Sequence, residues 1–153
     1  MWLDVLDYIA EALRAKQVAE HVIIGGINPT QAEIDSCGAV ILMRGEETPG
    51  DERVAGGFTV TFYLEAWIRD DSPDIRQGYE CLRKLEMRVD DVLTQIRADV
   101  GMLKNSMLND TYQLVDLRVN QKVGDADSLR PLVGVQYTLA ATVYDVTNEE
   151  GVW

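Results

Sequence analysis

Histidine, cysteine and basic residues are scarce in this chain of 153 residues. The one histidine, His21, has no HExxH or comparable motif around it, so a triad or a metalloprotease site would depend on that residue alone. Two cysteines, Cys37 and Cys81, cannot build a disulfide framework, which favours a reducing compartment. The common histidine-based and thiol-based active sites therefore have no support in the sequence.

The chain is also short of positive charge, with 14 Lys and Arg against 26 Asp and Glu and a net charge of -12. Affinity for a nucleic-acid backbone or an anionic membrane comes from Lys and Arg, so we expect no specific nucleic-acid binding and no membrane partner. No run approaches the roughly 18 apolar residues of a membrane helix. The segment MWLDVLDYIAEALRAK has acids where a secretion signal has a basic start, which predicts a protein that stays in the cytosol or in a particle assembled there.

Hydrophobic residues make up 46% of the chain, enough for a packed core, and no composition shift marks a boundary, so we predict a single domain over residues 1–153. Periods of 3.6 and 2 residues distinguish helices from strands. They predict helices over 2–19 and from 73 to about 96, and strands over 21–24, 39–43, 57–69, 112–119 and 132–146. Ser72 is the predicted N-cap of the second helix, with Pro73 at its first position. Mobile loops are expected near 26–36 and 44–56.

This order of elements predicts an α+β fold. Strands outnumber helices and several neighbouring strands are joined by short links. A mostly antiparallel sheet with two helices packed on one face, a two-layer sandwich, is the natural arrangement for such a chain. The opposite face of the sheet is then left without a cover.

That second face carries the one anomaly in the sequence. In GGFTVTFYLEAWIRDD the residues opposite the apolar side include Thr61, Tyr63 and Trp67, so aromatic rings stand where solvent is expected. The last strand repeats the bias. Aromatic anchors among few charges are typical of protein interfaces, whereas single surface aromatics are normal. We predict an oligomer interface formed by Thr61, Tyr63, Trp67, Thr138, Thr142 and Tyr144.

Other patterns give weaker indications of chemistry. Asp70-Asp71 and Asp90-Asp91 could hold Mg²⁺, but helix-start acids and a solvated helix face account for them. The glycine pairs 25–26 and 56–57 match no phosphate-binding motif. We therefore predict no catalytic, cofactor-binding or metal-binding residues. A metal-dependent enzyme and a small-ligand module remain the alternatives from other classes.

The layout resembles a known family. The amino-terminal helix, the strand FTVTFYLEAWIRD, the helix SPDIRQGYECLRKLEMRVDDVL and the last strand VQYTLAATVYDVTNEE look like the tail terminator, tail-completion and head-tail joining proteins of long-tailed bacteriophages. The resemblance covers nearly the whole chain and rests on the order of the elements and on the residue patterns of these segments.

The resemblance implies a structural virion protein of the tail or neck, assembled in the bacterial host cytoplasm and without catalysis. Such a protein forms a homo-oligomeric ring, usually a hexamer, that caps the tail tube protein and joins it to the head-tail connector protein while DNA passes through. In such families the long loops reach neighbours or line the channel, which here points to residues 44–56 and 26–36. A connector of the stopper or adaptor type, or a minor tail protein of the same assembly, is the related alternative.

The interface hypothesis makes a direct prediction. Trp67→Ala or Tyr63→Ala should weaken assembly and leave the fold intact, because a sister molecule rather than the chain itself would cover these rings.

Overall fold

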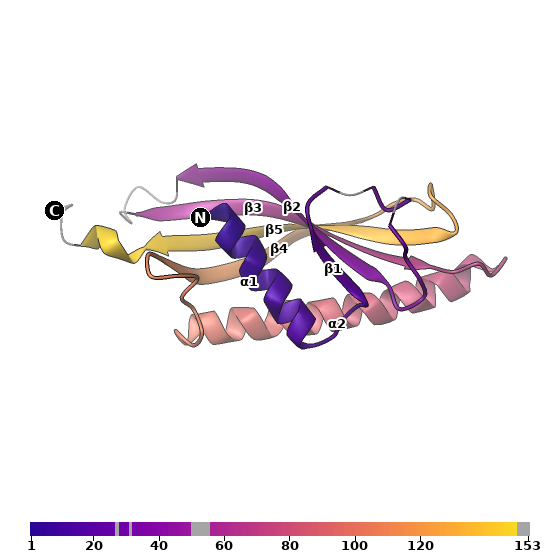
Figure 1. Ribbon diagram of the computed structural model, residues 1–153, viewed down its shortest axis with the longest axis horizontal. Coiled ribbons are helices and arrows are strands. Elements are labelled where there is room, and N and C mark those ends of the chain that lie inside the picture. Colours follow the sequence, from indigo (N-terminus) through magenta and orange to yellow (C-terminus); the bar gives the residue numbers. More distant parts are fainter. Residues whose placement is uncertain (27, 31, 50–55, 150–153) are drawn as a thin grey trace.

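The computed structural model of the protein describes residues 1–26, 28–30, 32–49 and 56–149. It is an α+β fold with a five-stranded sheet of order β1-β2-β3-β5-β4 and two α-helices (Figure 1). The elements are α1 (Trp2–Ala15), β1 (His21–Ile24), β2 (Ala39–Pro49), β3 (Gly57–Arg69), α2 (Ile75–Gly101), β4 (Tyr112–Gly124), β5 (Leu132–Asp145) and a short 3-10 helix, η1 (Val146–Glu149). The predicted α+β class is confirmed.

The sheet is mixed. β1 pairs with β2 in parallel, whereas the β2-β3, β3-β5 and β4-β5 pairs are antiparallel. A parallel pair needs a crossover connection, and the described residues between these two strands, 25–26, 28–30 and 32–38, form no helix. β3 and β5 are neighbours inside the sheet, and their pairing runs unbroken from Gly57↔Tyr144 to Arg69↔Leu132.

One large core combines residues of the sheet with residues of both helices. Alternate residues of β3, such as Phe62 and Leu64, share it with Ile9 of α1 and Leu85 of α2, and all four are fully buried. Burying each such side chain contributes about 1.5 to 3 kcal/mol. Figure 1 shows α2 lying along the sheet while α1 crosses in front of it.

Several boundaries differ from the sequence prediction. α1 ends at Ala15 rather than near Ala19, and the N-cap of α2 is Asp74, whose carboxylate accepts from the Arg76 N–H at 3.0 Å. Ser72 was the predicted cap, but its hydroxyl accepts from the Asp74 N–H instead. The reason is that the pre-helix turn is two residues longer than expected.

The two predicted loops are only partly described. Residues 44–49 continue β2 as a strand, with a bulge between Arg44 and Glu47, while residues 27, 31 and 50–55 lie outside the described residues. Gly45 fits this bulge because a Cβ there would come within 2.3 Å of the Thr61 carbonyl oxygen. The single domain and the mobility of both loops stay predictions. In the described part of the chain, no helix is long and apolar enough to cross a membrane.

Candidate assembly surface

The unbroken pairing of β3 with β5 determines which side chains lie together on the sheet face opposite the main core. Tyr63 pairs with Thr138, Thr61 with Ala140, and Thr59 with Thr142, so their side chains line one face. Five of the six predicted interface residues are half-buried on this face: Thr61, Tyr63, Thr138, Thr142 and Tyr144. We call these five the hydroxyl patch. Whether another molecule covers the patch stays a prediction.

The sixth residue, Trp67, has its cover within the chain. Its side chain is 6% exposed and packs in a second cluster with Ile34 from the β1-β2 crossover, Ile41 of β2 and Leu132 of β5. The ring lies over Gly134, where an added Cβ would come within 2.3 Å of ring atom Cε3. A residue with a side chain would therefore collide with the ring, and glycine provides the space that the indole occupies.

A short polar network orients the Trp67 ring. Its Nε1–H donates to Glu65 Oε1 at 3.0 Å, and Gln136 Nε2 donates to Glu65 Oε2 at 3.2 Å. The indole donor is thus satisfied while the ring stays buried. Trp67 consequently offers little surface to a partner, which differs from the expectation that a sister molecule covers it. The physical reason is that residues 32–34 fold back over this end of the sheet.

Charged residues at the edge of the outer face are paired with each other. Asp116 of β4 pairs with Thr142, and Arg118 pairs with Ala140. Their side chains form an ion pair of 3.6 Å, and Arg97 of α2 approaches Asp116 at 3.5 Å. The charges that flank the hydroxyl patch on β4 are therefore compensated, whereas Glu65, two residues from Tyr63 on the same face, accepts hydrogen bonds from Trp67 and Gln136 and has no cationic partner among the described residues.

One member of each acidic pair that could hold a metal is engaged in another contact. The Asp71 carboxylate lies 3.2 Å from Arg69 Nε. Asp90 accepts from Lys122 Nζ at 2.8 Å and from the Tyr137 hydroxyl at 2.9 Å. Within the described ranges, no group of three or more His, Cys, Asp or Glu residues is placed to hold a metal ion.

His21 and Cys37, the residues on which a histidine or thiol site would depend, lie elsewhere. His21 is exposed in the edge strand β1, and Cys37 is exposed in the crossover to β2. By strand register His21 shares the outer face with Trp67, because it pairs with Ala39, which pairs with Trp67, but it lies at the β1 edge and away from the patch pairs of β3 and β5.

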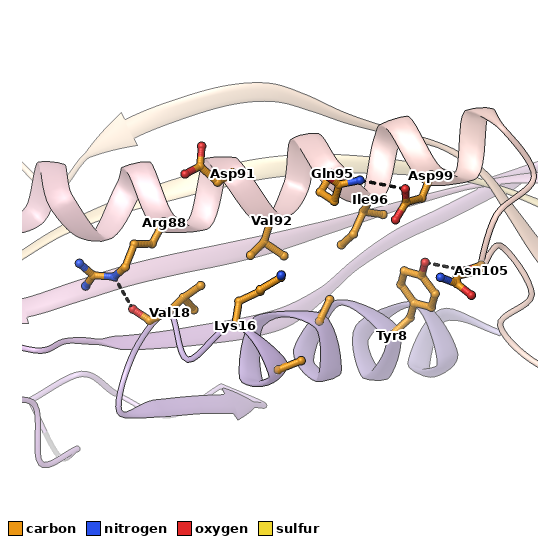
Figure 2. Close-up of a pocket in the computed structure, with 12 residues that line it drawn as sticks. Tyr8, Lys16, Val18, Arg88, Asp91, Val92, Gln95, Ile96, Asp99 and Asn105 are labelled. Carbon is orange, nitrogen blue, oxygen red and sulfur yellow. Dashed lines mark hydrogen bonds between the residues drawn. The ribbon is translucent and has the colours of Figure 1, made fainter.

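A second candidate surface lies on the helix layer, where α1 and α2 leave a groove of about 560 Å³ between them (Figure 2). Its apolar lining includes Ala12, Val18, Val92 and Ile96, and its polar rim includes Lys16, Arg88, Asp91 and Asp99. We call this the α1/α2 groove.

Hydrogen bonds hold both ends of the α1/α2 groove. Arg88 Nε donates to the Val18 carbonyl at 2.8 Å, and the Tyr8 hydroxyl donates to the Asn105 carbonyl at 2.7 Å (Figure 2). Burial, with the nearby Asp99 carboxylate, raises the pKa of the Tyr8 hydroxyl, so this donor stays protonated. Sequence reasoning missed the groove because it arises from how two separate helices cross; small residues such as Ala12 on α1 are its only local signal.

Comparison with known proteins gives one kind of match. No protein-family model matches the chain, and no curated protein does. Among solved structures, the fold is similar to a chain described as "Virion of native gene transfer agent (GTA) particle", with a TM-score of 0.56 and 17% sequence identity. The match covers 89% of this chain and 91% of that chain. At this identity the likeness shows a shared fold over nearly the whole length of both chains.

Proposed function

We propose that this protein is a structural component of a phage-like virion, and more specifically a tail terminator. In this role, copies of the chain form a ring that ends the tail tube and presents a surface to the head connector. The observation that carries the proposal is the fold likeness to a chain of a virion particle, which extends over 89% of this chain and 91% of that one. Because the match leaves no large unmatched domain in either chain, it favours a comparable role for this chain as a building block of a particle.

The hydroxyl patch supports the same proposal. It is a sheet face of half-buried Thr and Tyr side chains, flanked on β4 by the compensated pair Asp116 and Arg118. Open sheet faces that carry aromatic residues among few charges suit protein contacts better than small ligands, which bind in concave sites. A ring needs one patch that meets a different patch on the next copy, and the hydroxyl patch is one such surface.

Deletion of the gene in the strain that produces the particles tests the proposal. Without a terminator, tails should grow beyond their normal length and fail to join heads, which negative-stain images would show directly. Mass spectrometry of purified wild-type particles should also find the protein. Normal infectious particles in the deletion strain would overturn the proposal.

The same images separate the terminator from its nearest alternative. A connector of the stopper or adaptor type, or a minor tail protein, would leave detached tails of normal length when it is deleted. A metal-dependent enzyme, the alternative from another class, predicts heat on titration with Mg²⁺ or Mn²⁺. Calorimetry without a binding isotherm, using the complete protein, would remove that alternative.

A further inference from the structure

The crossover between β1 and β2 is fixed to the sheet at Asp35. The Asp35 carbonyl accepts from the Arg69 N–H at 2.9 Å, and its carboxylate oxygen Oδ1 accepts from the Cys37 N–H at 2.8 Å. The preceding residue, Ile34, is 5% exposed and packs in the cluster that covers Trp67. The position of Asp35 therefore determines whether this end of the outer face stays closed.

Asp35 also faces a second carboxyl group. Glu20 lies in the link between α1 and β1, and its side chain forms a hydrogen bond with the Asp35 side chain. Both residues are exposed and line the same surface hollow. Two ionised carboxylates cannot form this bond, because both only accept and both carry the same charge. The contact therefore requires one proton, held by one of the two carboxyl groups.

Other charged or titratable residues surround the pair. One comes from each neighbouring element and lines a hollow next to Glu20: Arg14 of α1, His21 of β1, Glu33 of the crossover, Arg69 of β3 and Arg88 of α2. The three arginines donate to other acceptors, namely the Val22 carbonyl, the Asp71 carboxylate and the Val18 carbonyl. A positive charge on His21 lowers the pKa of both carboxyl groups, but it is the smallest influence on each. The contact between Glu20 and Asp35 dominates.

This contact moves the two pKa values apart. The hydrogen bond with Asp35, followed by the charge of that carboxylate, raises the pKa of the Glu20 carboxyl above its usual value. The hydrogen bond with Glu20, together with the N–H groups of Cys37 and Gly38, lowers the pKa of the Asp35 carboxyl. Glu20 is therefore the member that holds the proton, and Asp35 is the member that accepts it.

We propose that Glu20 and Asp35 form a proton-dependent latch that holds the β1-β2 crossover on the sheet. With the proton on Glu20, its carboxyl donates to Asp35 and the crossover keeps Ile34 over Trp67. Without the proton, two carboxylates repel each other and the crossover opens more often. The latch is a property of the single chain and does not rest on the proposed function.

The direction of the pH effect follows from the two shifts. The pKa of Glu20 is higher in the folded chain, so its contribution to stability is complete below the unfolded pKa and is lost as the pH rises through the folded pKa. The pKa of Asp35 is lower in the folded chain, so its contribution is present above the unfolded pKa and is lost as the pH falls through the folded pKa. The latch is strongest between these two folded-state values, where the pair holds one proton, and weaker at neutral pH.

Carboxyl carbon NMR of the complete protein measures the shared proton directly. Glu20 should titrate at higher pH than ordinary glutamates. Asp35→Asn keeps an oxygen that can accept from the Cys37 N–H but removes the carboxylate, so the pKa of Glu20 should return to the ordinary range. The raised value should persist in a His21→Gln background, which removes the imidazole. Identical titration of Glu20 in the wild type and in Asp35→Asn would overturn the inference.

Amide hydrogen exchange measures the opening of the crossover. The probe is the Arg69 N–H, which the Asp35 carbonyl protects. In Glu20→Gln the side-chain amide can donate to Asp35 at any pH. At about pH 7 this variant should therefore protect the Arg69 N–H about two- to fivefold better than the wild type, and at about pH 4.5 the two proteins should match.

Glu33→Gln is the matched control for the exchange experiment. It removes a negative charge from the same hollow, and Glu33 forms no hydrogen bond with Asp35 in the described part of the chain. Its Arg69 N–H should exchange as in the wild type. The nearby Asp70 N–H, which donates to the Pro131 carbonyl, should exchange alike in all three proteins. The inference is overturned if Glu20→Gln gives no added protection at neutral pH, or if Glu33→Gln gives as much, because the effect would then be one of general charge.

Discussion

Replacing Trp67 by alanine should destabilise the protein itself. The side chain is 6% exposed, lies over Gly134 and donates a hydrogen bond to Glu65. Removing a buried Trp typically costs about 3 to 5 kcal/mol, because the packing is lost and a cavity remains. Since a whole domain is stable by only about 5 to 15 kcal/mol, this is a large part of the total. The effect on assembly would then be a consequence of a weakened fold.

Urea denaturation followed by far-ultraviolet circular dichroism measures this loss. With a denaturant slope of about 2 kcal/mol per molar urea, a loss of 3 kcal/mol lowers the midpoint by about 1.5 M. The matched control is Tyr63→Ala, which removes a half-buried ring from the same sheet face and should cost roughly 1 kcal/mol. Equal midpoints for Trp67→Ala and the wild type would refute the view that the chain covers this ring.

A second substitution locates the cause. A Cβ at position 134 would lie 2.3 to 2.6 Å from three atoms of the Trp67 ring, so Gly134→Ala should cost about 1 to 3 kcal/mol by overpacking. In the Trp67→Ala background there is no ring to displace, and the same glycine change should cost almost nothing. Additive costs in this double-mutant cycle would show that the ring does not lie over Gly134.

Two further predictions concern α2 and the core. Asp74→Ala removes the side chain that accepts from the Arg76 N–H and should cost about 1 kcal/mol, so the melting temperature should fall by about 2 to 4 °C. Asp74→Asn keeps a capping side chain and is the control. Equal melting temperatures for the wild type and both variants would contradict the prediction. Burial, with the neighbouring Asp90 carboxylate, raises the pKa of the Tyr137 hydroxyl. Above about pH 10 tyrosine ionises in the unfolded chain but not in the folded one, so stability should fall there, and Tyr137→Phe should reduce that fall in melts at pH 9 and 10.5.

Element type was predictable from this sequence because the hydrophobic periods are strong. The alternation in Gly57–Arg69 defines β3 over its full length, and His21–Ile24 also forms the predicted strand. The prediction for β4 stopped at Val119, whereas the strand continues to Gly124. Residues 120–124 are exposed at the sheet edge, so pairing with β5 extends the strand where no apolar alternation marks it.

The cover of Trp67 could not be predicted for a different reason. Ile34 lies 33 positions before it in the sequence, in a crossover with no regular hydrophobic period. Only the parallel pairing of β1 with β2 brings that crossover over the outer face, and local sequence carries no signal for it. The α1/α2 groove has the same character, because it depends on how two helices cross.

The outer sheet face consequently has two unequal ends. Near Trp67 it is closed by residues 32–34 and by Leu129 and Leu132, so a partner would meet a surface already packed. Toward the Gly57↔Tyr144 end it carries the hydroxyl patch, whose side chains are half-buried and lie beside compensated charges. If copies pack through the sheet, the contact must lie over this second end. Thr142→Lys should then weaken the contact, because it places an unpaired charge in the interface. The burial of Trp67 should be the same in the free and the assembled protein.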